Sequence, residues 1–290
     1  MKISVLLWPT RSWPETGALW RHAEELGFHS AWLYDHIAWR GNTPWYDAYA
    51  TLAAAAAVTS RIGLGTMVTS PNFRHPVPTA HAAKTIDHVS GGRLSLGIGA
   101  GGANRTSDGG ILGGPDWTPR ERADRFAEWV GLLDRLLTEP EVTYEGTYYS
   151  AREVRGGGCV QSPRVPFVIA GNGPRGMRLA ARHGAGWVST GERAAAGDPW
   201  SAVRARVETL SAVCEEEGRD PATLRRILLT GFTGEPWLES PQSFADLSAR
   251  HGELGFDEIV VHWPRERTAF DGDLDLDGDM KVFESIAPAG

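Results

Sequence analysis

The chain has 290 residues, of which 41% are hydrophobic and 22% are charged, and its formal net charge is −7. The length fits one large α/β barrel or two ordinary domains, and the negative charge disfavours nucleic acid as a partner, since phosphate binding needs a clustered basic face. No apolar run is long enough to span a membrane, no signal peptide is evident, and the two cysteines imply no disulfide framework, so we expect a cytoplasmic protein.

Short apolar runs alternate with segments of helical periodicity along most of the chain. The predicted strands cover residues 3–7, 30–34, 62–69, 93–99, 165–170, 186–190, 225–230 and 258–262. The predicted helices cover residues 14–26, 46–59, 77–89, 119–137, 175–183, 200–217, 241–254 and 280–286. This regular alternation, without any linker-like change in composition, predicts an α/β fold with a single (β/α)8 (TIM) barrel over residues 1–290.

Two segments interrupt the alternation. Residues 101–118 form a long polar stretch with two pairs of glycines, which we interpret as an insertion loop of functional or mobile character. Residues 141–163 begin with alternating side chains around Glu145 and Gly146, which predicts a small hairpin added to the barrel.

Asp35 and His36 follow the second predicted strand. In parallel α/β folds, ligands bind at the carboxyl ends of the strands. A histidine in that position can exchange a proton near neutral pH, and an adjacent carboxylate can orient it or bind a donor of the ligand. The alternative is an ordinary surface turn, but the position favours a catalytic pair. Trp8, after the first strand, and Trp39 are candidates for the pocket wall.

The sequence GIGAGG at residues 97–102 matches the dinucleotide-binding fingerprint GxGxxG. A true fingerprint opens a helix immediately, whereas here a long polar stretch follows the glycines. We therefore reject a Rossmann-type site and interpret these glycines as backbone that approaches a flat ligand closely.

Asn172, Gly173, Pro174 and Arg175 connect a predicted strand to a predicted helix. Proline suits the first position of a helix, and the free amides at a helix start favour a phosphate group. Arg175 and the hydroxyl of Thr190, which precedes Gly191 at the end of the next strand, are candidates to assist. An ordinary turn also requires glycine, so the alternative of a plain connection stays open.

Two segments of the sequence bear on metal binding. The run from Asp273 to Glu284 matches the calcium-loop pattern DxDxDGx5E, but a helix should precede such a loop, and Asp279 is better explained as the cap of the last helix; the pattern alone leaves calcium open. A metal-dependent barrel hydrolase needs ligands after the first strand, where residues 7–10 supply none. We therefore expect no metal in the active site.

Three segments in combination resemble the bacterial luciferase-like family, whose members are barrel enzymes that use reduced flavin or the deazaflavin coenzyme F420. These segments are IGLGTMVTSP at residues 62–71, DHVSGGRLSLGIG at 87–99 and IAGNGP at 169–174. The sequence WLYDH at residues 32–36 is most similar to the deazaflavin branch. The resemblance covers most of the chain.

The resemblance implies roles for individual positions. His36 would be the active-site acid or base, and Asp35 would contact the cofactor. Met67 and Val68 would form a bulge behind the central ring of the cofactor, where the family often has a non-prolyl cis peptide bond. Asn104 and Arg105 would border the ring or its side chain, and the positions that would bind the cofactor phosphate are Asn172, Gly173, Thr190 and Gly191. These positions agree with the helix-start argument, which adds Pro174 and Arg175 as candidates.

The implied activity is hydride transfer between F420 and a small organic substrate, with His36 as acid or base. The alternatives are a reduced-FMN-dependent monooxygenase, which would need a flavin reductase as partner, and a non-catalytic flavin-binding protein. A sugar-phosphate dehydrogenase of this branch has a catalytic glutamate where this chain has Gly102, so the substrate stays open. Trp8, Trp39 and Phe73 suggest an apolar or ring-bearing substrate. The alanine-rich helices at residues 46–58 and 77–89 are expected to form a homodimer interface.

Overall fold

The predicted strands form a closed parallel barrel. The computed structural model describes residues 1–39, 42–103, 108–191, 199–233, 235, 237–265 and 278–288. Around the barrel the strands are ordered β1-β10-β9-β8-β7-β4-β3-β2, which confirms the predicted (β/α)8 architecture. Their bounds are β1 (Lys2–Leu7), β2 (Ser30–Leu33), β3 (Gly63–Thr69), β4 (Leu94–Gly99), β7 (Phe167–Ala170), β8 (Gly186–Ser189), β9 (Arg225–Leu229) and β10 (Glu258–His262).

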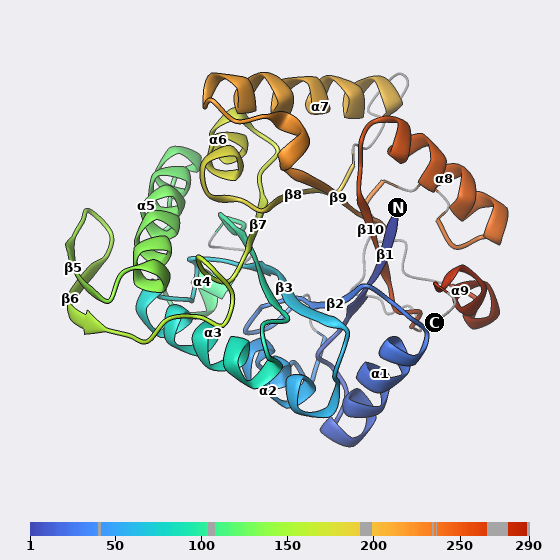
Figure 1. Cartoon of the computed structure of the whole chain (residues 1–290), viewed down its shortest axis with the longest axis horizontal. Coiled ribbons are helices and arrows are strands. Elements are labelled where there is room, and N and C mark those ends of the chain that lie inside the picture. The colour runs from blue at the N-terminus through green and yellow to red at the C-terminus, as the bar shows by residue number, and fades with distance from the viewer. Residues whose placement is uncertain are drawn as a thin grey trace.

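The helices form a layer around the outside of this barrel (Figure 1). Their bounds are α1 (Trp13–Glu25), α2 (Ala48–Val58), α3 (Pro76–Ser90), α5 (Pro119–Thr138), α6 (Pro174–His183), α7 (Pro199–Glu216), α8 (Pro241–Glu253) and α9 (Met280–Ile286), with a 3-10 turn η2 (Pro221–Thr223) before β9. Capping boxes fix the starts of α1 and α5, where Ser12 pairs with Glu15 and Thr118 with Glu121. Within the described ranges, no helix combines the length and apolar character needed to cross a membrane.

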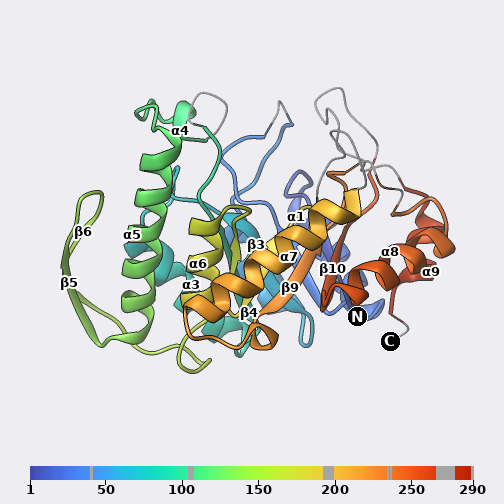
Figure 2. The same ribbon diagram turned by 90° about the horizontal axis from the view of Figure 1, so that it is seen from above.

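Both interruptions of the alternation have defined structure. The stretch at residues 101–118 contains a short helix, α4 (Asp108–Ile111), where an irregular loop was expected. Figure 2 shows α4 at one end of the barrel, beside the start of α5. The predicted hairpin is confirmed as β5 (Glu141–Glu145) paired antiparallel with β6 (Ser150–Arg155). Glu128 of α5 holds its turn by accepting hydrogen bonds from the backbone amides of residues 147–149.

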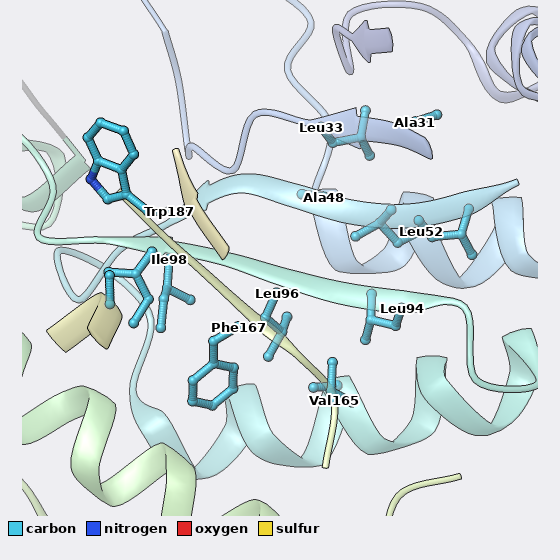
Figure 3. Close-up of a cluster of buried hydrophobic side chains, with 14 of the residues drawn as sticks. Ala31, Leu33, Ala48, Leu52, Leu94, Leu96, Ile98, Val165, Phe167 and Trp187 are labelled. Carbon is cyan, nitrogen blue, oxygen red and sulfur yellow. The ribbon is translucent and has the colours of Figure 1, made fainter. Parts of the chain in front are cut away.

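Buried side chains form two layers because neighbouring residues of a strand point to opposite sides. One layer lies between the barrel and the helices, and Figure 3 shows Leu94, Leu96 and Ile98 of β4 pointing from one side of the strand toward this layer. The other layer fills the inside of the barrel with residues such as Leu6, Trp32, Met67, Val188 and Val260. Parallel strands covered on both sides require near-continuous apolar runs, which is the pattern seen in the sequence.

The interior of the barrel is filled toward the amino ends of its strands. The indole nitrogen of Trp32 donates a hydrogen bond of 3.3 Å to Glu258, the first residue of β10. Gly65 of β3 makes room for the Trp32 ring, since a Cβ atom there would overlap the indole. Glu258 also lies 3.6 Å from the guanidinium of Arg225. These side chains close the barrel at the amino ends of the strands, so a ligand cavity is expected at the carboxyl ends.

Candidate active site

A cavity of about 670 Å³ opens at the carboxyl ends of the strands. Residues from the ends of β2, β3, β4, β7, β8 and β9 converge on it, as expected for the functional face of a barrel. Most of the wall is apolar or backbone. The lining residues are Tyr34, His36, Trp39, Met67, Val68, Ser70, Gly99, Ala100, Gly101, Gly102, Asp108, Ala170, Gly171, Asn172, Val188, Thr190, Leu229 and Phe232.

His36 lies at this cavity, where the sequence places it. Its Nδ1 atom is 2.8 Å from the carboxylate of Asp108 in α4, and its ring is stacked on Trp39 with 4.5 Å between the ring centroids. The Asp108 side chain is buried, and its second oxygen accepts a hydrogen bond of 2.7 Å from the backbone amide of Ile37. Asp108 was not among the residues predicted from the sequence. The length of the insertion was the available signal, but nothing in it distinguished one carboxylate from another.

Asp35 has surroundings other than those expected from the resemblance. Its carboxylate is completely buried and does not line the cavity. Arg74 donates two hydrogen bonds to it, of 2.6 Å and 3.1 Å, and the hydroxyl of Thr69 donates a third, of 2.7 Å. Burial raises the pKa of Asp35, and the neighbouring Arg74 opposes that effect. The geometry therefore supports a structural role, in which Asp35 ties the end of β2 to the end of β3.

The rear wall of the cavity contains the bulge expected at Met67 and Val68. The peptide bond between these residues is cis, as the resemblance implied, and both side chains line the cavity. The pairing of β3 with β4 shifts register between Thr66 and Thr69, so the strand is irregular at this position. The glycine-rich end of β4 lines the same cavity, and the described residues that follow it, 100–103, are not helical, in agreement with the rejection of a Rossmann site.

The proposed phosphate site is assembled only in part. Asn172 lines the cavity, Gly173 precedes the first turn of α6, and a Cβ atom at Gly173 would meet no atom within 4 Å. Amides in the first turn of a helix have no partner within the helix, so this end of α6 is suited to an anion. Arg175 does not contribute, because its guanidinium contacts Asp124 of α5 instead.

The orientation of α6 depends on close backbone packing. A Cβ atom at either Gly171 or Gly176 would lie 2.7 Å from the Cα atom of the other residue. The end of β7 and the first turn of α6 therefore meet backbone to backbone. Directly after the next strand, β8, Thr190 lines this cavity and also a smaller adjoining cavity of about 300 Å³, whereas Gly191 lines only the smaller one.

The structure separates the three predicted pocket residues. Trp39 lines the cavity, but Trp8 and Phe73 do not. The indole of Trp8 donates a hydrogen bond of 3.4 Å to His262 and packs against Tyr34, while Phe73 packs on the guanidinium of Arg74. Both were misassigned because a position near a strand end does not determine which way a side chain points. The apolar wall is instead completed by Tyr34, Val188, Leu229 and Phe232.

Three predictions fall partly or wholly outside the described residues. Asn104 and Arg105 are not described, and neither are residues 273–277 of the calcium-like pattern. The described part of that pattern supports the alternative explanation, because the Asp279 side chain caps α9 by accepting a hydrogen bond of 2.7 Å from the amide of Lys281.

A family model described as Luciferase-like monooxygenase matches residues 2–234. The match covers most of the chain, which therefore belongs to the luciferase-like monooxygenase family. This membership confirms the resemblance recognised in the sequence.

Curated relatives of the chain include two F420-dependent dehydrogenases. The chain is 39% identical over 173 residues to the F420-dependent glucose-6-phosphate dehydrogenase of Beutenbergia cavernae. The aligned segment covers 58% of this chain and 50% of the relative. The chain is 32% identical over 224 residues to the F420-dependent hydroxymycolic acid dehydrogenase of Mycobacterium tuberculosis. The aligned segment covers 73% of this chain and 57% of the relative. The chain thus spans about half the length of the curated relatives it matches.

A solved structure shares the fold over nearly the whole chain. An F420-dependent secondary alcohol dehydrogenase, in complex with an F420-acetone adduct, superposes with a TM-score of 0.78 at 19% identity. The superposition covers 99% of this chain and 98% of that chain. At this identity the likeness shows the fold alone.

Proposed function

We propose that this protein is an F420-dependent oxidoreductase that transfers a hydride between the coenzyme and a small, largely apolar organic substrate. The observation that carries the proposal is the position of His36, which combines a carboxylate partner with access to the barrel cavity. The dependence on F420 in the names of the two curated relatives supports the choice of coenzyme.

The residues present fit a flat, phosphate-bearing cofactor. Met67, Val68 and residues 99–102 line the cavity with apolar side chains and backbone, against which a ring could lie. Asn172 and the start of α6, with Thr190, would hold a phosphate group at one side of the cavity. F420 and FMN both carry a phosphate, so this part of the site does not discriminate between them.

The bound coenzyme would supply two-electron hydride chemistry, and the protein would supply orientation and proton transfer. His36 would give or take the proton that accompanies oxidation or reduction of a substrate oxygen, since an imidazole exchanges protons near neutral pH. Trp39, stacked on the imidazole, restricts the plane of the ring. Tyr34, Leu229 and Phe232 line the apolar wall and would exclude water around the reacting atoms.

Titration of the purified protein with F420 and with FMN, each oxidised and reduced, tests the coenzyme. Tryptophan fluorescence is a suitable signal, because Trp39 lines the cavity. Tight binding of F420 over FMN is the expected result. A preference for reduced FMN would indicate the alternative, a monooxygenase that activates dioxygen, and would overturn the proposal.

A His36→Ala variant tests the role of the histidine. It should bind F420 with the affinity of the unmodified protein, while turnover falls by roughly 10²- to 10⁴-fold, the usual contribution of a general acid or base. Full retention of activity would show that another group transfers the proton. Normal binding of F420 by the unmodified protein without turnover of any alcohol or carbonyl compound would indicate a flavin-binding protein instead.

A further inference from the structure

Asp108 forms the closest polar contact of His36. One carboxylate oxygen lies 2.8 Å from Nδ1 of the imidazole, and the other lies 2.7 Å from the amide nitrogen of Ile37. Its side chain is only 1% exposed, against 21% for His36. Among the described residues that line the cavity, Asp108 is the one that carries a carboxylate.

The two contacts fix where the hydrogen atoms lie. A backbone amide can only donate, and an ionised carboxylate can only accept. Both groups facing Asp108 must therefore donate to it, so Nδ1 of His36 carries a hydrogen. In a neutral imidazole the other nitrogen, Nε2, is then the acceptor.

We propose that Asp108 is the positioning residue of the active site, which selects the tautomer of His36 and leaves Nε2 as the atom that exchanges the proton. The catalytic consequence rests on the proposed function, whereas the choice of tautomer does not. Trp39 fixes the plane of the ring, and Asp108 fixes its rotation and the place of its hydrogen. The insertion at residues 101–118 thereby contributes to the chemistry of a histidine borne by another part of the chain.

Asp108→Asn is the most informative variant, because it is nearly isosteric and offers one oxygen instead of two. The amide of Ile37 can only donate, so it should keep that oxygen, and the NH2 group of the asparagine should then face Nδ1 of His36. The contact would turn Nδ1 into an acceptor and move the hydrogen to Nε2. The substitution should therefore invert the tautomer without removing the side chain.

Nitrogen-15 NMR of histidine-labelled protein without added coenzyme reads the tautomer directly. The chain has nine histidines, so the His36 signals are assigned by their loss in His36→Ala. At alkaline pH, where imidazoles are neutral, the unmodified protein should show His36 protonated at Nδ1 and Asp108→Asn should show it protonated at Nε2. An unmodified protein with the hydrogen on Nε2 overturns the proposal, even if the variant fails to fold.

Kinetics supply the second readout. Asp108→Asn should lower kcat by roughly 10²- to 10⁴-fold, as expected when the acid or base is disabled, while KM and the affinity for F420 stay close to their original values. Asp116→Asn, an exposed position in the same insertion, is the matched control and should keep kcat. Equal kcat for the two variants overturns the positioning role. An inverted tautomer in a protein that does not bind F420 would instead uphold the positioning role and refute the proposed function.

Discussion

The imidazole of His36 lies nearly flat against the indole of Trp39, with the ring centroids 4.5 Å apart and the planes 24° from parallel. Both residues line the cavity at the carboxyl ends of the strands. The contact brings together two different side chains. His36 can transfer a proton, whereas Trp39 mainly provides an apolar surface. It therefore offers a direct way to measure how much the orientation of the imidazole matters.

Replacing Trp39 with alanine should lower kcat by about threefold to tenfold. Aromatic pairs contribute about 0.5–1.5 kcal/mol beyond the burial of their area, and about 1.4 kcal/mol corresponds to a factor of ten. Trp39→Phe retains a stacked ring and should recover most of the loss, as steady-state kinetics at saturating F420 would show. A tenfold loss in both variants would mean that the indole acts through something other than stacking.

Replacing Arg74 with glutamine should lower the free energy of unfolding by about 3–5 kcal/mol, the usual effect of leaving a buried charge without its partner. Arg74 is the cation beside the completely buried Asp35, and it also lies 2.7 Å from Asp47. Urea unfolding followed by circular dichroism would measure the change. Adding Asp35→Asn should recover part of the loss, because the unpaired charge is then removed.

The control for Arg74 is an exposed ion pair of similar geometry. Arg155 lies 2.9 Å from Glu141 in the hairpin, and its side chain is 74% exposed. Exposed pairs contribute less than about 1 kcal/mol, so Arg155→Gln should have little effect. Losses of equal size at the two arginines would contradict the importance of burial.

Replacing Gly176 with alanine should lower the free energy of unfolding by about 1–3 kcal/mol, the range found when atoms are forced into packed sites. The new Cβ atom would lie 2.7 Å from the Cα atom of Gly171. Because the clash displaces the start of α6, the affinity for F420 should fall as well. Gly131 within α5 is the matched control, since a Cβ atom there meets no atom within 4 Å. Gly131→Ala should stabilise the protein by about 0.5–1 kcal/mol, and the reverse order of the two variants would refute the packing argument.

The stability of the protein should fall on acidification in part because of His262. This side chain is completely buried between Trp8 and the carbonyl of Thr230, and burial lowers the pKa of His262 to about 4, assisted by the charge of Arg265. The unfolded chain binds a proton near the ordinary histidine pKa of about 6.5. Stability that is fully present above about pH 6.5 is therefore lost as the pH falls toward 4, by about 3 kcal/mol in total.

The contribution of His262 can be isolated by comparing two pH series. Free energies of unfolding for His262→Gln should decline less steeply between neutral pH and pH 5 than those of the unmodified protein, because other histidines act equally in both. Parallel curves would show that His262 is not held neutral in the folded protein.

The sequence was sufficient to predict the barrel because its strands are buried on both sides and appear as continuous apolar runs. The strand at residues 258–262 and the helix at 280–286 were predicted with the bounds that the structure shows. The same regularity placed His36 at the ligand-binding end. The prediction of the cis bond between Met67 and Val68 had a different basis, since only the family resemblance suggested it.

Side-chain contacts between distant segments were beyond the sequence. Asp108 lies 72 residues from His36 in the chain, and no local pattern links the two. Arg175 looked like a phosphate ligand because it follows a helix start, yet the first turn of α6 directs it to Asp124 on the neighbouring helix. Trp8 was misassigned for a similar reason, because its hydrogen bond to His262 joins residues 254 positions apart in the chain.

The fit between Trp32 and Gly65 has a consequence for how this barrel can change. A Cβ atom at position 65 would overlap the indole and would lie 2.6 Å from the backbone oxygen of Ser95, so a smaller residue at position 32 would remove only one of the two overlaps. A substitution that enlarges residue 65 should therefore be damaging both alone and together with a smaller residue at 32, because the backbone oxygen of Ser95 cannot be removed by mutation. This limit set by the backbone makes the closed end of the barrel resistant to change, while the open end can acquire new specificities one substitution at a time.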